Sequence, residues 1–563
     1  MKSLLAATAI AIACAPAILV QAQPQNVGCD GQVTAKTGRS GPCSELAKQI
    51  AEVLSAPAVA RAHWGIDVTA MDGSPIYSMN AGQLFQPASN TKMFTTATAL
   101  AVLGAQTTFE TKIIARGKFN GAAKLAGDVV LVGAGDANLS GRTIPYVPPA
   151  LRPKGAPGQQ PPPGPPALRY LEDMADQVAK TGLKVVNGDV VGDDTLYPWE
   201  PYPEDWSIDD SVWGYGAPIS ALTITDNQLT VKVSPGAAAG QPAIVTVDPI
   251  FPYYTVDTAA LITGPAKSGS HVQIDRALGS KELRIYGSIA VDAHTDEEEL
   301  AIHDPAEFAA AALKSMLEAR GILVTGVARA KHRISTDSRG FMQASHEPVP
   351  EIDWTKTYKA PTQLISCLNS DCKILEAAFA NPLARHISPP LIEDMVVTNK
   401  VSQNLHAEIF LRNVGGAVFV GDSSTVNGAR VVRAFLEHAG VDKDDYVFFD
   451  GSGLSGHDLV APRATARLLQ FASTQSWFAD WKSTLPIGGE DGSLVERFPK
   501  APLKDHVFAK TGTLGEARAL SGYLDCASGR TVIFSIMDSA HTPRSNADRE
   551  AMDKIVGLIA AAN

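Results

Sequence analysis

Apolar side chains recur at helical spacing near both ends of this chain. Residues 90–103 are the clearest case: the apolar positions fall on one face of a helix, and Gly104 follows as a stop signal. The members of this face are Met93, Phe94, Ala97, Leu100 and Ala101. The same spacing predicts further helices over residues 44–54, 305–321, 392–414, 423–440, 460–473 and 546–559.

Strand patterns fill the middle of the chain and also occur near its ends. Residues 64–80 predict two strands that turn at 72–75, and residues 507–510, 519–524 and 530–537 predict three more near the C-terminus. Between 107 and 333, short β-like runs alternate with Gly/Asp turns, most densely over about 223–292. Helix-plus-strand segments therefore bracket a β-rich middle.

This pattern predicts an α/β (α+β) domain split by a large insertion. Residues 23–106 and 334–563 form the discontinuous domain, and residues 107–333 form the inserted β-rich part, with a nested strand-rich subdomain at about 223–292. Residues 145–166 contain ten prolines in 22 residues, which predicts an exposed, extended loop.

The first 22 residues have the pattern of a secretory signal. Lys2 precedes an apolar run from Leu4 to Val20, and Val20-Gln21-Ala22 is a small-x-small cleavage site. A membrane anchor is the alternative, but the run is short for a bilayer span. Lipid attachment at Cys14 is a second alternative. We expect an exported protein with no integral membrane span after cleavage.

The net charge and the spacing of Cys and His residues argue against several classes of function. The formal charge of −11 argues against a nucleic-acid partner, which would need a basic surface. No His-Glu-x-x-His and no zinc-like Cys/His spacing occurs, so we expect no metal and no cofactor. In an oxidising compartment, Cys29 would pair with Cys43 and Cys367 with Cys372, which leaves Cys526 unpaired.

Three short motifs supply the candidate chemistry. They are Ser89-Asn90-Thr91-Lys92, Ser402-Gln403-Asn404 and Lys510-Thr511-Gly512, in this order. Each tetrapeptide or tripeptide alone is common and has an ordinary structural explanation as a helix cap, a polar loop or a strand end. Together they supply a serine nucleophile, two amines and a carboxamide, which is the motif set of penicillin-binding proteins and β-lactamases.

The first motif places a base beside a nucleophile. Ser89 and Lys92, three residues apart at a helix start, share one helix face with Cβ atoms about 5–6 Å apart. Lysine can accept the serine proton if burial or a neighbouring cation lowers its pKa, and Lys510 is a candidate for that cation.

The other two motifs supply positioning groups. Ser402 is a candidate proton relay between Lys92 and the leaving amine, and Asn404 is expected to bind both Lys92 and a substrate amide. Lys510 and Thr511 are expected to bind a substrate carboxylate, and Gly512 lets a ligand approach the strand closely. The N–H groups of Thr513 and Ser89 are candidates for an oxyanion hole.

With these motifs placed, the chain resembles the D-alanyl-D-alanine carboxypeptidase/endopeptidase family, peptidase family S13, of the class C penicillin-binding protein type. The resemblance extends to the segments 86–92, 399–408, 450–455, 485–489 and 509–514, in family order. Residues 93–401 separate the first two motifs, which suits a family with extra domains at this point and is too long for an ordinary β-lactamase.

The resemblance implies a transpeptidase-like domain with a central antiparallel sheet flanked by helices. It also implies periplasmic hydrolysis of peptidoglycan stem peptides through an acyl-enzyme on Ser89, with β-lactam antibiotics as covalent inhibitors. Lys92 is the implied base, Ser402 and Asn404 the relay and positioner, and Lys510, Thr511 and Thr513 the carboxylate-binding residues. Two departures from the family pattern are Gln403, where Asp is common, and the proline-rich loop.

Two rival functions remain open from the sequence. One is a β-lactamase or serine esterase on the same scaffold, although no Glu-x-x-Leu-Asn segment suggests a dedicated deacylating base. The other is a non-catalytic cell-wall scaffold protein, against which the intact set of motif residues argues. The oligomeric state and the role of the insertion do not follow from the sequence.

Overall fold

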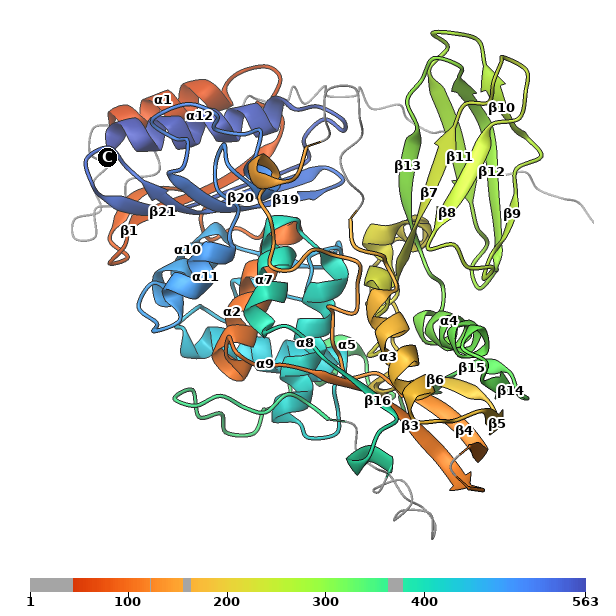
Figure 1. The fold of residues 1–563 in the computed structure, drawn as a ribbon. Coiled ribbons are helices and arrows are strands. Elements are labelled where there is room, and N and C mark those ends of the chain that lie inside the picture. Colours follow the sequence, from red (N-terminus) through yellow and green to blue (C-terminus); the bar gives the residue numbers. More distant parts are fainter. Residues whose placement is uncertain (1–43, 122, 155–163, 363–377) are drawn as a thin grey trace, which may run out of the picture.

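A five-stranded antiparallel sheet forms the centre of the domain that contains both ends of the described chain (Figure 1). The computed structural model describes residues 44–121, 123–154, 164–362 and 378–563. The strand order is β19-β20-β21-β1-β2. The strands are β1 (His63–Ala70), β2 (Pro75–Met79), β19 (Val507–Leu514), β20 (Ala517–Asp525) and β21 (Thr531–Ser539).

Helices cover both faces of this sheet. Strand β21 explains how: Val532, Phe534 and Ile536 face the core under α1 and α12, whereas Ile533 and Met537 face the core on the other side. On that second side lie α2, α8, α9, α10 and α11, with α7 beside them (Figure 1). The helices are α1 (Glu45–Leu54), α2 (Thr91–Leu103), α7 (Leu391–Lys400), α8 (Asn404–Val418), α9 (Thr425–His438), α10 (Pro462–Ala472), α11 (Phe478–Thr484) and α12 (Ala547–Ala562).

Local signals fix several of these boundaries. Helix α1 begins after Ser44, whose Oγ accepts a hydrogen bond from Ala47 N at 3.2 Å. Helix α2 ends at Gly104, which has φ = +83°, a conformation that glycine adopts without strain. The α/β architecture with an antiparallel, helix-flanked sheet and a β-rich insertion confirms the predicted fold class.

The inserted part contains three further sheets (Figure 1). A seven-stranded mixed sheet packs against α3 (Arg169–Lys180) and α4 (Pro305–Ala319). It consists of β3 (Glu110–Phe119), β4 (Lys124–Val132), β5 (Val185–Asn187), β6 (Val190–Pro198), β14 (Leu323–Val324), β15 (Ala328–Arg333) and β16 (Ala384–Ile387). The smaller sheets contain β7 (Gln228–Ser234), β8 (Ile244–Asp248) and β13 (Asp296–Ala301), and β9 (Thr255–Asp257), β10 (Leu261–Gly264), β11 (Ser270–Asp275) and β12 (Glu282–Ala290).

Strand pairing crosses the expected end of the insertion at residue 333 and the expected end of its nested strand-rich part at residue 292. Strand β16 pairs antiparallel with β3, so the seven-stranded sheet takes a strand from beyond residue 333. Strand β13 pairs with β7, which extends the nested strand-rich part from 292 to about 301. Both differences arise because the partner strands are distant in sequence, where turn signals give no information.

The segment expected to form one helix over 392–414 forms two. Helix α7 ends at Lys400 and α8 begins at Asn404. Between them, Ser402 has φ = +64°, a left-handed conformation that interrupts the helix. The apolar pattern continues across the break, so it predicts a single helix. The break is stabilised by tertiary contacts, about which a local pattern contains no information.

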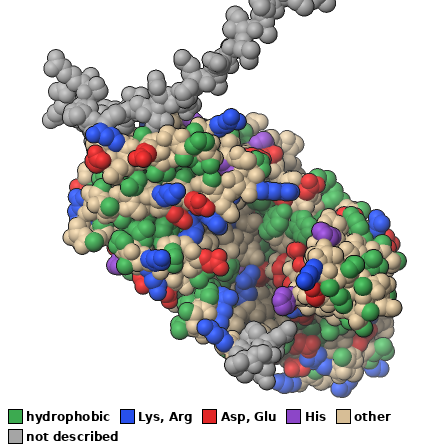
Figure 2. Space-filling view, turned by 90° about the horizontal axis from the view of Figure 1, so that it is seen from above, with side chains coloured by type: hydrophobic (Ala, Val, Ile, Leu, Met, Phe, Trp, Pro, Cys, Tyr) green, Lys and Arg blue, Asp and Glu red, His purple; other side chains and the backbone are tan. Residues whose placement is uncertain are grey.

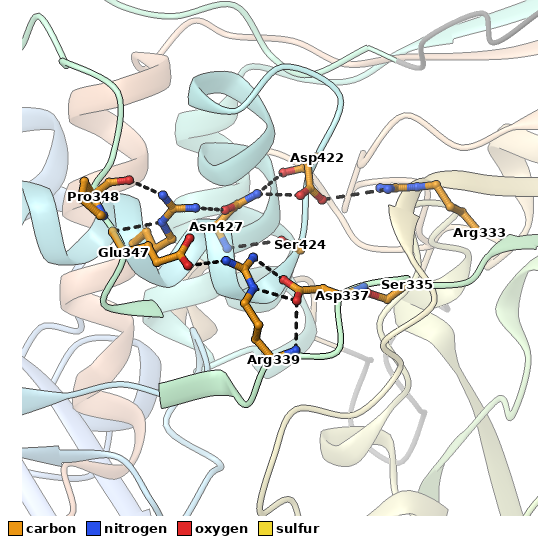
Figure 3. Close-up of polar contacts among 10 residues, drawn as sticks. Arg333, Ser335, Asp337, Arg339, Glu347, Pro348, Asp422, Ser424 and Asn427 are labelled. Carbon is orange, nitrogen blue, oxygen red and sulfur yellow. Dashed lines mark hydrogen bonds and ion pairs between the residues drawn. The ribbon is translucent and has the colours of Figure 1, made fainter. Parts of the chain in front are cut away.

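The chain returns from β15 to the domain of the five-stranded sheet through a segment held by ion pairs (Figure 3). Arg339 pairs with both Asp337 and Glu347. Glu347 contributes its backbone carbonyl to Arg430 Nε on α9 at 3.2 Å. Arg333 Nη1, at the end of β15, lies 3.9 Å from Asp422 Oδ1.

Several sequence expectations lie wholly or partly outside the described residues. They concern the signal segment with Cys14, both expected disulfides and part of the proline-rich loop, of which residues 145–154 and 164–166 are described. Cys526 is described, buried and free, as expected. Within the described ranges, no helix combines the length and the apolar character that crossing a membrane requires.

Candidate active site

Ser89 and Lys92 face each other at the start of α2. Ser89 lies in a 3-10 turn (Ala88–Asn90) that leads into this helix, and the preceding Ala88 has φ = +46°. The Lys92 Nζ atom lies 2.9 Å from Ser89 Oγ, and the Lys92 side chain is completely buried. The predicted proximity of nucleophile and base is therefore present.

The partners of Lys92 suit an uncharged amine. Nζ lies 2.6 Å from Asn404 Oδ1 and 2.7 Å from the Ser452 carbonyl oxygen, and both of these atoms only accept hydrogen bonds. A neutral amine has two N–H donors and one lone pair. Its donors match the two oxygens, and its lone pair is left facing the Ser89 hydroxyl.

Burial lowers the pKa of Lys92 from 10.5 to about 7. The carboxyl groups of Asp450, Glu408 and Asp458 oppose this shift but do not cancel it. The sequence suggested Lys510 as the cation that lowers this pKa. Desolvation of the amine, the other cause that the sequence left open, is the dominant one.

The Asp450–Ser455 turn brings the Ser452 carbonyl to Lys92. The Asp450 carboxylate accepts hydrogen bonds from four backbone N–H groups, those of residues 452–455, and from Trp206 Nε1. Gly453 packs so closely on the nucleophile segment that a Cβ there would lie 1.8 Å from the Ala88 carbonyl oxygen. The family resemblance includes residues 450–455 but does not identify the Ser452 carbonyl as a contact of Lys92.

The second motif lies at the break between α7 and α8. Asn404 is the first residue of α8, and its Nδ2 donates to the Tyr215 carbonyl at 2.9 Å. This contact with the inserted part was not predicted. One Nδ2 hydrogen stays free to bind a substrate amide, since the carboxamide has two N–H donors.

The side chain of Lys510, on β19, has the second motif as its partner, and not the side chain of Lys92. Its Nζ lies 2.9 Å from Ser402 Oγ and 3.0 Å from the Thr511 carbonyl oxygen. Burial lowers the pKa of Lys510 well below its usual value, and the charge of Lys92 lowers it further. The backbone is tied to the nucleophile turn, because Asn90 Nδ2 donates to the Lys510 carbonyl at 3.0 Å.

The remaining third-motif residues continue along β19. A Cβ at Gly512 would lie 2.4 Å from the Pro87 carbonyl oxygen and 3.2 Å from Ser89 N, so glycine is needed where the strand meets the nucleophile turn. Thr511 Oγ1 lies 2.7 Å from Ser493 Oγ. Thr513 is exposed and pairs with Arg518 on β20.

Two charged residues beside the second motif are buried and paired with carboxylates. Lys400 is buried and pairs with Asp491 at 2.6 Å, which ties the end of α7 to the loop at 488–492. His406 is completely buried between Asp394 and Asp226. Their partners are distant in sequence or in another element, so no local signal could have identified them.

A cavity of about 400 Å³ borders the second motif. Seen from above, the surface is hollowed between the body that carries α1 and α12 and the lobe of β7–β13 (Figure 2). The cavity is lined on one side by residues 401–404 and on the other by Arg142, residues 213–215 and Glu297–Glu299 on β13. The inserted part therefore supplies one wall of the space next to the candidate catalytic residues.

One group of described side chains has the proximity that a metal ion would require. Ligand atoms of Asp538, His541 and Asp548 lie within 4.8 Å of one another. Arg518 Nε is 2.7 Å from Asp548 Oδ2 and already supplies positive charge there. None of these residues belongs to the Ser89 cluster, and we assign them no metal.

Comparison with known proteins identifies a family. The model of the D-Ala-D-Ala carboxypeptidase 3 (S13) family matches residues 46–352 and 372–561. A D-alanyl-D-alanine carboxypeptidase of Actinomadura sp. (strain R39) is 31% identical over 511 residues, which cover 89% of this chain and 82% of that protein. The D-alanyl-D-alanine carboxypeptidase DacB of Haemophilus influenzae is 22% identical over 462 residues, 82% of this chain and 81% of that protein.

Solved structures show the same fold. Penicillin binding protein 4 (dacB) of Haemophilus influenzae superimposes with a TM-score of 0.70 at 20% identity and covers 91% of this chain and 98% of its own. A second structure of that protein, complexed with a novel beta-lactam, has a TM-score of 0.64 at 20% identity, with coverage of 92% and 99%.

Proposed function

This chain belongs to the D-Ala-D-Ala carboxypeptidase 3 (S13) family, and from the geometry of its cleft we propose that the enzyme works through an acyl-enzyme on Ser89. As a member of this family it is a serine-type D-Ala-D-Ala carboxypeptidase, a hydrolase. The observation that carries the proposal is the surroundings of Lys92: two obligate acceptors and the Ser89 hydroxyl at 2.9 Å.

Acylation begins with proton transfer. Neutral Lys92 accepts the Ser89 proton as Oγ attacks the carbonyl carbon of the penultimate D-Ala. The N–H groups of Ser89 and Thr513 stabilise the negative charge that develops on the carbonyl oxygen. The C–N bond then breaks, and the proton held by Lys92 passes to the leaving amine with Ser402 as relay. Water hydrolyses the ester and restores Ser89.

Substrate orientation falls to the other motif residues. The C-terminal carboxylate of the peptide binds Thr511, Thr513 and the ammonium form of Lys510, which a bound anion stabilises strongly in a low-dielectric cleft. Asn404 uses its free Nδ2 hydrogen to hold the substrate amide while Oδ1 holds Lys92. Gly512 lets β19 lie directly against the nucleophile turn, which keeps Ser89 beside the strand that carries Lys510 and Thr511.

The substrates follow from the family and its relatives. We propose peptidoglycan stem peptides as substrates, both terminal D-Ala–D-Ala bonds and D-Ala–diaminopimelate cross-links, and β-lactams as covalent inhibitors that acylate Ser89. Among the relatives, a beta-lactam complex is recorded for the Haemophilus influenzae protein. This chemistry takes place outside the cytoplasm, in the periplasm, which agrees with the signal pattern of residues 1–22.

Digestion of purified cross-linked muropeptides, read by mass, tests the proposal. Loss of one alanine reports carboxypeptidase action, and splitting of dimers reports endopeptidase action. We expect both with the wild-type protein and neither with Ser89→Ala. Alanine release by Ser89→Ala would refute the assignment of the nucleophile.

A further inference from the structure

A buried histidine links the second motif to the inserted part of the chain. His406 lies on α8, two residues after Asn404, and its side chain has no exposed surface. Its Nδ1 lies 2.5 Å from Asp394 Oδ1 on α7. Its Nε2 lies 3.2 Å from Asp226 Oδ1, which comes from the turn before β7.

Because both ring nitrogens face carboxylates, only the imidazolium can donate at both positions. The charges of Asp394 and Asp226 outweigh burial and raise the pKa of His406 to about 9. A third carboxyl group, Asp136 after β4, also lies near; burial raises its pKa to about 7, against the lowering effect of His406. A cation at His406 therefore balances carboxylates from three elements.

The backbone around Asp226 is held in an unusual conformation. Thr225, Asp226 and Asn227 have φ of 50°, 56° and 54°, so three consecutive non-glycine residues are left-handed. Such conformations persist only where surrounding contacts enforce them. Here Asn227 Nδ2 donates to the Pro218 carbonyl at 2.8 Å, and the turn directs the Asp226 carboxylate at His406.

The series of charged residues that begins at Asp394 and His406 continues to the cavity beside the second motif. The second oxygen of Asp226 pairs with Arg142 Nε, and this contact together with His406 lowers the pKa of Asp226 despite burial. Arg142 lines the cavity that borders Ser402 and Asn404. The inserted part thus holds α8 through Asp226, in addition to the direct contact between the Tyr215 carbonyl and Asn404.

Ser402 depends on such support. It lies in the break between α7 and α8 with φ = +64°, and the His406–Asp394 contact joins these two helices across the break. We propose that His406 is a positioning residue whose contacts with Asp394 and Asp226 lock the two helices to the inserted part, so that Ser402 and Asn404 face Lys510 and Lys92. This role rests on the proposed function and gives the inserted part a task in catalysis.

Kinetics of matched variants test this role. His406→Gln removes the imidazolium that contacts both carboxylates, and Asp226→Ala removes one of its two partners. For each variant we expect both kcat on a D-Ala-D-Ala peptide and the rate of acylation by labelled penicillin to fall about 10- to 100-fold, with KM changed less than about threefold. Asp226→Asn keeps an acceptor for Nε2–H and should stay within about fivefold of wild type.

The matched control is His332→Gln. His332 on β15 also lies between two carboxylates, with Nδ1 2.9 Å from Asp194 and Nε2 3.3 Å from Asp304, but it touches neither α7 nor α8. We expect it to lower the melting temperature and to leave kcat unchanged. An equal fall of kcat in His332→Gln would show a general stability effect and overturn the proposal.

Two further kinetic outcomes bear on the positioning role of His406. Wild-type kcat and acylation rates in His406→Gln and Asp226→Ala, or a rise of KM with unchanged kcat, would also overturn it. If neither variant folds, Arg142→Ala serves instead, because the Arg142 side chain is 32% exposed. We expect kcat of this variant to fall about 3- to 10-fold. An unchanged kcat would refute the positioning role of His406. If wild type itself takes no label and releases no alanine, the proposed function fails and not the positioning role.

Discussion

The pH dependence of acylation tests the role of Lys92 most sharply. The perturbation is twofold: a pH series on the wild-type protein and the substitution Lys92→Arg. Arginine keeps the positive charge and much of the length of lysine, but its guanidinium does not lose a proton in proteins. It therefore removes the base and keeps the cation.

The structure sets the magnitude. With the ordinary lysine pKa of 10.5, about one side chain in 3,000 would be neutral at pH 7, whereas a pKa of about 7 makes about half of them neutral. The difference between these two pKa values corresponds to about 5 kcal/mol in favour of the neutral amine. Burial thus raises the population of the active base at pH 7 by roughly three orders of magnitude.

The assay is the second-order rate constant for labelling by a fluorescent penicillin. For the wild-type protein, this constant should be level above pH 7 and fall about tenfold for each pH unit below it, so that the rate at pH 5 is about 100-fold lower. Lys92→Arg should lower the constant by at least about 100-fold at pH 7.5. A wild-type rate that does not change between pH 7 and pH 5, or an arginine variant within tenfold of wild type, would refute the reasoning.

Three further predictions follow from the same structure. Gly512→Ala should slow penicillin labelling about 100-fold or more, because its Cβ would lie 2.4 Å from the Pro87 carbonyl oxygen; stopped-time labelling checks this. Lys510→Gln should raise KM about 10- to 100-fold for peptides with a free C-terminal carboxylate, and steady-state kinetics with an amidated peptide as control measure it. His406→Gln should lower the free energy of unfolding by about 3 kcal/mol at pH 6, because the folded pKa of about 9 exceeds the unfolded value. A histidine whose pKa is raised in the folded state stabilises the fold fully below pH 6.5, and this stabilisation is lost as the pH rises through 9. Urea unfolding should therefore show a smaller difference in stability between wild type and His406→Gln at pH 9.5 than at pH 6.

The parts of the site that lie close together in sequence are predictable. Ser89 and Lys92 are three residues apart on a helix with a clear apolar face, and helix geometry alone brings them together. A strand over 507–510 follows from its apolar residues, but the strand in the structure continues to Leu514 and so includes Gly512. The family resemblance rests on the three motifs, on the long gap between the first two, and on the further segments at 450–455 and 485–489.

The parts of the site that depend on tertiary contacts are not predictable in this way. The Ser452 carbonyl lies in a turn that the sequence indicates, but only folding selects which of its carbonyls faces Lys92. The break at Ser402 is invisible in an apolar pattern that continues through it. His406 and Lys400 resemble surface residues because their carboxylate partners cannot be identified from local sequence.

The inserted part illustrates the same limit. Its strands and its β-rich character follow from local alternation, but the pairing of β16 with β3 and of β13 with β7 joins distant segments. Tyr215, Asp226 and Arg142 have no motif around them, and their relation to the second motif becomes visible only in three dimensions.

The central claim is that the hydroxyl beside Lys92 forms the covalent intermediate. The most direct measurement is to trap the protein with penicillin, digest it and locate the added mass by peptide sequencing. We expect one adduct, on the peptide that contains Ser89, with no adduct in Ser89→Ala. An adduct on another residue, or none at saturating penicillin in a folded protein, would contradict it.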